Sequence, residues 1–117
     1  MSGRLTTHVL DTARGRPAAG LRIELFRIEG NNRQRIGEFV TNDDGRVSEP
    51  ILAPPDFLPG IYELVFHVGD YQKSVSTADE NPRFLDLVPI RFGLSEAEHY
   101  HVPLLLAPFG YSTYRGS

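Results

Sequence analysis

Residues suited to acid–base and anion-binding chemistry stand near both ends of the sequence and once in its middle. The four histidines are His8, His67, His99 and His101, and Arg46 directly follows the turn-forming run DDG. A histidine takes up or releases a proton near neutral pH, and the guanidinium of an arginine offers a rigid fork to carbonyls and anions. Each of these residues alone more often has a structural or surface role, so their chemistry depends on whether the fold gathers them.

The sequence lacks the motifs of several other enzyme classes. It contains no cysteine, which excludes disulfides, thiolate metal ligands and cysteine nucleophiles. It has no GxSxG elbow, no glycine-rich phosphate loop and no HExxH pair of zinc ligands. His99 and His101 would share one face of a strand and could bind a metal, but no third ligand accompanies them. A metal site is therefore the less favoured interpretation, and water would be the attacking group in any hydrolysis.

Composition and charge narrow the class of partner. The 117 residues, 40% of them hydrophobic, are enough for one folded domain with its own core. The net charge of −3 and the lack of a basic stripe with interleaved aromatic residues argue against nucleic-acid binding. No apolar run approaches the ~20 residues of a membrane span, and the N-terminal segment lacks the apolar core of a signal peptide. We expect a cytoplasmic protein that does not contact membranes.

Turn signals recur about every ten residues, a spacing typical of an all-β sandwich or barrel. Glycine, proline, asparagine and aspartate supply them, for example in Asn42–Gly45 and Pro108–Gly110. One or two helical turns are predicted at Asp70–Ser76, and the proline-rich stretch Pro50–Pro59 is predicted to be a connection. A switch in the apolar pattern at Leu25–Phe26 predicts a bulge. The predicted strands are Leu5–Asp11, Leu21–Ile28, Gln34–Thr41, Arg46–Pro50, Ile61–Val68, Leu85–Phe92, Tyr100–Leu106 and Tyr111–Arg115.

Strand parity places three candidate residues on one surface. Alternate residues of a strand point to opposite faces, so His8 and His101 point away from the apolar faces of their strands, and Tyr114 falls on the same side. Leu10 and Leu105 lie there too, and a face that mixes histidines with leucines is typical of a surface covered by a partner subunit. A tyrosine supplies a flat wall and a hydroxyl. Together with an arginine, this set suits the hydrolysis of a planar, polar, nitrogen-rich small molecule.

Three motifs resemble those of the 5-hydroxyisourate hydrolases, the transthyretin-related enzymes of urate breakdown. They are the opening LTTHVLDTARGRPAAGLRIEL, the central TNDDGR and the terminal YHVPLLLAPFGYSTYRGS, and the resemblance covers essentially the whole chain. The opening motif also occurs in non-enzymatic sandwiches of this kind, whereas transthyretin lacks the terminal YRGS. Transthyretin has lysine, glutamate and threonine where His8, Arg46 and His101 stand here. One departure from the hydrolase pattern is Ala107, where serine is common in the family.

The resemblance implies a single domain over residues 1–117, an all-β, eight-stranded transthyretin-like sandwich with one short helix after the fifth strand. It implies a homotetramer with sites at the dimer–dimer interface, in a channel faced by the first, seventh and eighth strands. It also implies an enzyme without a metal or organic cofactor. Water would open the ring of 5-hydroxyisourate to give 2-oxo-4-hydroxy-4-carboxy-5-ureidoimidazoline.

The resemblance also suggests roles for individual residues. His8 or His101 would orient and deprotonate the water, and the choice between them stays open. Arg46 would begin a strand beside the histidines, hold a carbonyl oxygen of the substrate and stabilise the negative charge that grows there. Tyr114 would contact the ring. Ser117 would fix the C-terminal tail and bond to the substrate or to a histidine.

Two other functions fit the same fold class, a small-molecule carrier and a structural sandwich domain of a larger assembly. The carrier interpretation predicts loss of the histidine pair and of the terminal tetrapeptide, and both are present. The structural interpretation predicts linkers or tandem domains, and none is seen within these 117 residues.

Overall fold

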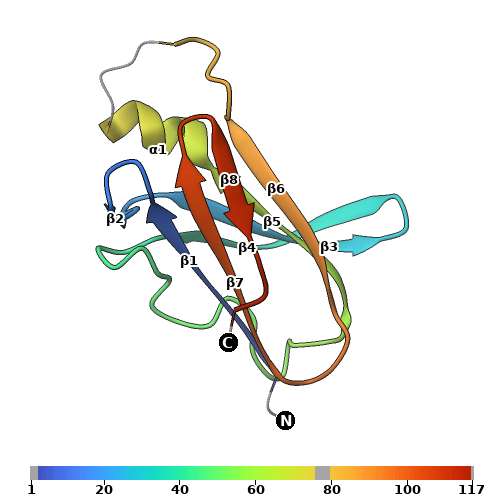
Figure 1. The fold of residues 1–117 in the computed structure, drawn as a ribbon. Helices are drawn as coiled ribbons and strands as arrows, with labels where there is room; N and C mark the ends of the chain where they lie inside the picture. The colour runs from blue at the N-terminus through green and yellow to red at the C-terminus, as the bar shows by residue number, and fades with distance from the viewer. Residues whose placement is uncertain (1–2, 76–79, 117) are drawn as a thin grey trace.

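The computed structural model describes residues 3–75 and 80–116 as two four-stranded β-sheets and one helix (Figure 1). The strand order is β2-β1-β7-β8 in the first sheet and β4-β3-β5-β6 in the second. β1 and β7 run parallel, whereas every other neighbouring pair is antiparallel. The elements are β1 Arg4–Asp11, β2 Arg16–Pro17, β3 Arg22–Glu29, β4 Asn32–Val40, β5 Gly60–His67, α1 Val68–Val75, β6 Leu87–Leu94, β7 His99–Ala107 and β8 Gly110–Thr113.

The hydrophobic core lies between the two sheets. Leu5 and Val9 of β1 are fully buried, as are Leu104 of β7 and the aromatic rings of Tyr62 and Phe66 on β5. Full burial of side chains of this size contributes about 1.5–3 kcal/mol each. Burial alternates along β1, as parity predicts, so the residues between the core positions of this strand point to the outer face of the first sheet.

One predicted strand is wrong. Residues 46–50 form no strand, and an unpredicted two-residue strand, β2, completes the set of eight. The segment instead follows the edge of β1 through isolated bridges, His8 to Arg46 and Leu5 to Leu52. Regular pairing fails because Gly45 turns the chain with φ 72°, and because the segment ends at Pro50, which has no amide hydrogen to donate.

The bulge and the helix agree with the sequence pattern. The register between β3 and β4 shifts at Leu25 and Phe26, and beyond the shift Phe26 packs with Val65 in a small cluster apart from the main core. α1 begins two residues before the predicted helical turns, and the predicted end at Ser76 lies outside the described residues. Within the described ranges, no helix is long and apolar enough to cross a membrane.

Candidate active site

His8 and His101 lie in direct contact on the outer face of the first sheet. The parallel register of β1 and β7 sets Thr6 opposite His101 and His8 opposite Pro103. His8 Nδ1 is 2.6 Å from His101 Nε2, and the two rings lie edge to edge, with centroids 4.8 Å apart and planes 25° apart. These imidazoles therefore form one hydrogen-bonded unit.

The hydrogen bonds continue beyond this pair. The Thr6 hydroxyl oxygen lies 2.7 Å from His101 Nδ1 and 2.9 Å from His99 Nε2. Thr6 and His8 alternate with the buried residues of β1, and His99 and His101 are likewise two residues apart on β7. A continuous series of side-chain hydrogen bonds thus connects His8 to His101, His101 to Thr6 and Thr6 to His99.

Burial and positive charge keep the two central histidines neutral near pH 7. Only 8% of His101 is exposed, and burial, followed by electrostatic interactions with His8, Arg46 and His99, lowers its pKa to about 4. Burial and then Arg46 also lower the pKa of His8 below its usual 6.5. A neutral imidazole keeps one lone pair free to accept a hydrogen bond or a proton.

A tight turn places Arg46 beside His8. The Asn42 side-chain oxygen accepts hydrogen bonds from the backbone amides of Asp44, at 2.9 Å, and Arg46, at 3.2 Å. The Val9 amide donates to the Gly45 carbonyl at 2.8 Å, which ties the turn to β1. In residues 3–75 and 80–116, no side chain pairs with the Arg46 guanidinium, which is therefore available to a ligand.

We expect Gly45→Ala to lower the free energy of unfolding by at least ~2 kcal/mol, because both the backbone and the space require glycine. The φ of 72° disfavours other residues, and a Cβ there would lie 2.5 Å from the Val9 carbonyl oxygen. Urea unfolding would measure the loss. The control is Gly15→Ala, where φ is 68° but nothing lies within 4 Å of the added Cβ. Equal losses in the two variants would contradict the steric argument.

The C-terminal segment packs against His101. The Gly116 amide donates to the His101 carbonyl oxygen at 2.6 Å, and a Cβ on Gly116 would lie 2.8 Å from Cδ2 of the His101 ring. Arg115 holds the segment from the other side, since its guanidinium stacks 4.0 Å from the Tyr100 ring centre and donates to Glu98 at 2.7 Å. Ser117, a predicted site residue, lies outside the described residues.

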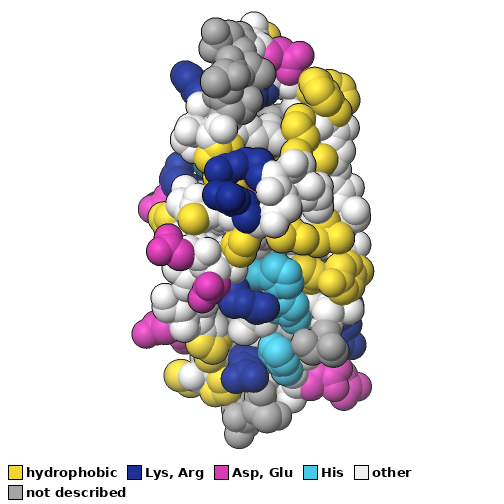
Figure 2. Space-filling model, turned by 60° about the vertical axis from the view of Figure 1, so that its left-hand side comes forward, with side chains coloured by type: hydrophobic (Ala, Val, Ile, Leu, Met, Phe, Trp, Pro, Cys, Tyr) yellow, Lys and Arg dark blue, Asp and Glu magenta, His cyan; other side chains and the backbone are white. Residues whose placement is uncertain are grey.

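The predicted site residues within the described ranges line one open cavity of about 560 Å³. His8, Arg46, His101 and Tyr114 all contribute to it. Figure 2 shows the histidines gathered on this face, with arginine or lysine side chains beside them and apolar side chains adjoining. Among the described residues, no three His, Asp or Glu side chains are arranged to hold a metal ion.

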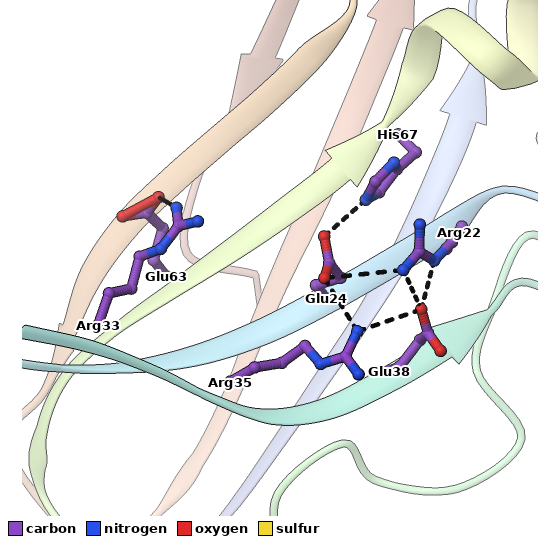
Figure 3. Close-up of polar contacts among 7 residues, drawn as sticks. All are labelled: Arg22, Glu24, Arg33, Arg35, Glu38, Glu63 and His67. Atoms are coloured by element: carbon purple, nitrogen blue, oxygen red, sulfur yellow. Dashed lines mark hydrogen bonds and ion pairs between the residues drawn. The ribbon is translucent and has the colours of Figure 1, made fainter.

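The fourth histidine lies apart from this cavity, on the outer face of the second sheet (Figure 3). His67 Nε2 is 2.7 Å from Glu24 Oε1, and Arg35 also bonds to Glu24, at 3.2 Å. The His67 hydrogen bond, more than the neighbouring Arg35 and Arg22, lowers the pKa of Glu24. The ion pair between Arg22 and Glu38 extends the same network. His67 thus belongs to a network of hydrogen bonds and ion pairs on the second sheet.

Sequence reasoning did not assign Thr6, His99 and Gly116 to the site. Parity already placed Thr6 on the face of His8, and His99 was weighed only as half of a metal-binding pair. The missing information is the β1–β7 register, which sets Thr6 opposite His101 and brings its hydroxyl within hydrogen-bond distance of both His99 and His101. The position of Gly116 depends on an isolated bridge to His101 beyond the end of β8, which no periodic pattern reveals.

Comparison with known proteins identifies the family. The model described as "HIUase/Transthyretin family" matches residues 5–116. The chain belongs to the HIUase/transthyretin family. A family member named 5-hydroxyisourate hydrolase 2, from Rhizobium meliloti (strain 1021), is 61% identical over 117 residues, covering 99% of this chain and 98% of the relative.

Solved structures of the HIUase/transthyretin family share the fold. Klebsiella pneumoniae 5-hydroxyisourate hydrolase superposes with a TM-score of 0.82 at 34% identity, and the match covers 100% of both chains. Sea bream transthyretin in complex with thyroxine gives a TM-score of 0.86 at 22% identity, covering 97% of this chain and 94% of that one. The second likeness establishes the transthyretin-like sandwich and nothing about activity.

Proposed function

We propose that this chain, acting as one domain, hydrolyses 5-hydroxyisourate to 2-oxo-4-hydroxy-4-carboxy-5-ureidoimidazoline in purine catabolism. The observation that carries the proposal is the cavity shared by the His8–His101 pair, Arg46 and Tyr114. A chain 61% identical to a protein named 5-hydroxyisourate hydrolase 2 supports the same reaction. The site supports an enzyme rather than a carrier, because it offers both a neutral base and a cation.

In the proposed reaction the histidine pair removes a proton from water, and the resulting hydroxide attacks a ring carbonyl carbon. The free guanidinium of Arg46 stabilises the negative charge on the carbonyl oxygen. The ring carbon–nitrogen bond then breaks, and the histidine returns its proton to the departing nitrogen, so that atoms and charge balance. Tyr114 lies flat against the substrate ring, and Ser117 holds the end of the tail at the site. All of these groups come from the chain itself, so the reaction needs no cofactor.

We further propose that the active form is a homotetramer with its sites at the dimer–dimer interface. Aromatic side chains of and around β8 are exposed, with 67% of Phe109, 44% of Tyr111 and 55% of Tyr114 accessible in the isolated chain. A subunit packed over this face would bury these rings. It would also exclude water from the open side of the cavity, which strengthens the interaction of Arg46 with the developing charge.

The direct test is to generate 5-hydroxyisourate in the cuvette and follow its absorbance as it decays. The expected result is decay far faster than the spontaneous rate and proportional to the concentration of the chain. Decay at the spontaneous rate, with binding detected by calorimetry, would favour a carrier. Decay at the spontaneous rate without binding would favour a structural domain, and either result would overturn the proposal.

We expect Arg46→Gln to lower kcat by about 10²–10³-fold, the usual cost of removing one oxyanion-stabilising group. Steady-state kinetics with the same assay would measure the effect. Arg35→Gln is the matched control, because it removes an arginine from the opposite sheet, where Arg35 pairs with Glu24. An equal loss in both variants would show that the effect comes from net charge rather than from the position of Arg46.

A further inference from the structure

The series of hydrogen bonds from His8 to His99 determines which histidine nitrogen can act as a base. His101 is engaged at both ring nitrogens, with Nε2 on His8 and Nδ1 on Thr6. His8 is engaged at Nδ1 alone, and no hydrogen bond between described residues uses its Nε2. The lone pair that can reach a water in the cavity is therefore that of His8 Nε2, provided that this nitrogen carries no hydrogen.

Whether it carries a hydrogen depends on which atom donates in each of these hydrogen bonds, and two directions are possible when Thr6 donates to one histidine and accepts from the other. Each neutral imidazole has one N–H and one lone pair, and the Thr6 hydroxyl has a single hydrogen to donate. In one direction His99 donates to Thr6, Thr6 to His101 and His101 to His8, which leaves a hydrogen on His8 Nε2. In the opposite direction His8 donates to His101, His101 to Thr6 and Thr6 to His99, which leaves a lone pair on His8 Nε2.

The charges around the cavity favour the second direction. Arg46 is bridged to His8 and lines the same cavity as both histidines, and a cation favours lone pairs over N–H groups on the atoms that face it. Arg4 and Glu49 are the other charged residues of the cavity. The low exposure of His101, 8%, keeps that ring neutral, so that it can accept from His8.

We propose that Thr6 and His99 are positioning residues, in which the Thr6 hydroxyl donates to His99 and thereby fixes His101 as its Nδ1–H tautomer, leaving His8 Nε2 as the base. The inference rests on the proposed function. When His8 takes the proton from water at Nε2, its Nδ1–H points at the neutral His101 Nε2 and the charge is stabilised there. The same Nε2 then returns the proton to the departing ring nitrogen.

The first test reads the tautomer without any substrate. Imidazole nitrogen chemical shifts, measured by NMR on ¹⁵N-labelled protein, distinguish Nδ1–H from Nε2–H. We expect the Nδ1–H form of His101 in the wild type and in Thr6→Ser, which keeps the hydroxyl. Thr6→Val has nearly the same shape without the hydroxyl, and we expect it to lose that form. A His101 tautomer that is Nε2–H in the wild type, or unchanged in Thr6→Val, would overturn the proposal.

The second test uses kinetics. We expect Thr6→Val to lower kcat about 10–100-fold with little change in KM, within the range of acid–base catalysis, and Thr6→Ser to restore most of it. Thr12→Val removes a hydroxyl that donates to Leu106 at 3.0 Å and should leave kcat unchanged. A Thr6→Val enzyme with the kcat and pH profile of the wild type would contradict the inference. If the wild type itself does not hydrolyse 5-hydroxyisourate, the proposed function fails, and the NMR result alone decides the role of Thr6.

Discussion

His101→Asn is expected to lower kcat by about 10²–10⁴-fold, the range attributed to positioned acid–base groups. His101 Nε2 lies 2.6 Å from His8 Nδ1, and the two rings lie edge to edge. Asparagine can form hydrogen bonds, but it is too short to reach both His8 and Thr6. The pair would therefore lose the partner that stabilises the protonated base. Single-turnover measurements with 5-hydroxyisourate would separate this effect from product release.

The variant should remain folded, and its pH dependence supplies a second measurement. His101 has a pKa of about 4 in the folded chain and about 6.5 when unfolded, so between these values the unfolded state binds more protons. Its contribution to stability is complete above pH ~6.5 and is lost as the pH falls toward 4. The free energy of unfolding, measured with urea at several pH values in this window, should decrease less steeply with falling pH in His101→Asn than in the wild type. A variant with wild-type turnover would remove His101 from the mechanism.

The sequence predicts well which face of a strand each residue occupies. Burial alternates along a strand with a period of two, and the spacing of apolar residues in β1 and β7 shows this period. It therefore places His8, His101 and Tyr114 on one surface before any pairing is known. It does not reveal that Thr6 lies opposite His101, because these residues are 95 positions apart in the sequence and their register depends on how β1 and β7 pair. The contact of the Thr6 hydroxyl with both His99 and His101 depends on that register.

Arg46 shows a different limit. The sequence predicts a strand at residues 46–50, and a strand paired with β1 would also place Arg46 beside His8. The structure reaches the same place with a turn: Asn42 caps the backbone of Arg46, and Gly45 adopts a φ of 72° against the Val9 carbonyl. The position of the guanidinium thus depends on turn geometry and one bridge, which local propensity describes poorly.

Deletion of residues 115–117 is expected to reduce turnover to the spontaneous rate, because Gly116 lines the cavity and packs against His101. Gly116 donates to the His101 carbonyl at 2.6 Å and lies against its ring. Arg115 fixes that segment through Glu98 and Tyr100. Without these contacts the outer side of His101 opens to water, which raises its pKa and weakens its fixed hydrogen bond to His8.

Gly116→Ala tests the packing of the C-terminal segment on His101 by adding a single methyl group. Its Cβ would lie 2.8 Å from His101 Cδ2, so either the ring or the segment must move, and we expect a loss of about 10-fold or more in kcat from the misplaced imidazole. Gly110→Ala is the control, since nothing lies within 4 Å of its added Cβ at the start of β8. Full activity in the truncated chain would show that the tail is no part of the site. Full activity in Gly116→Ala alone would show that the tail contributes through Arg115 or Ser117 rather than through its packing on His101.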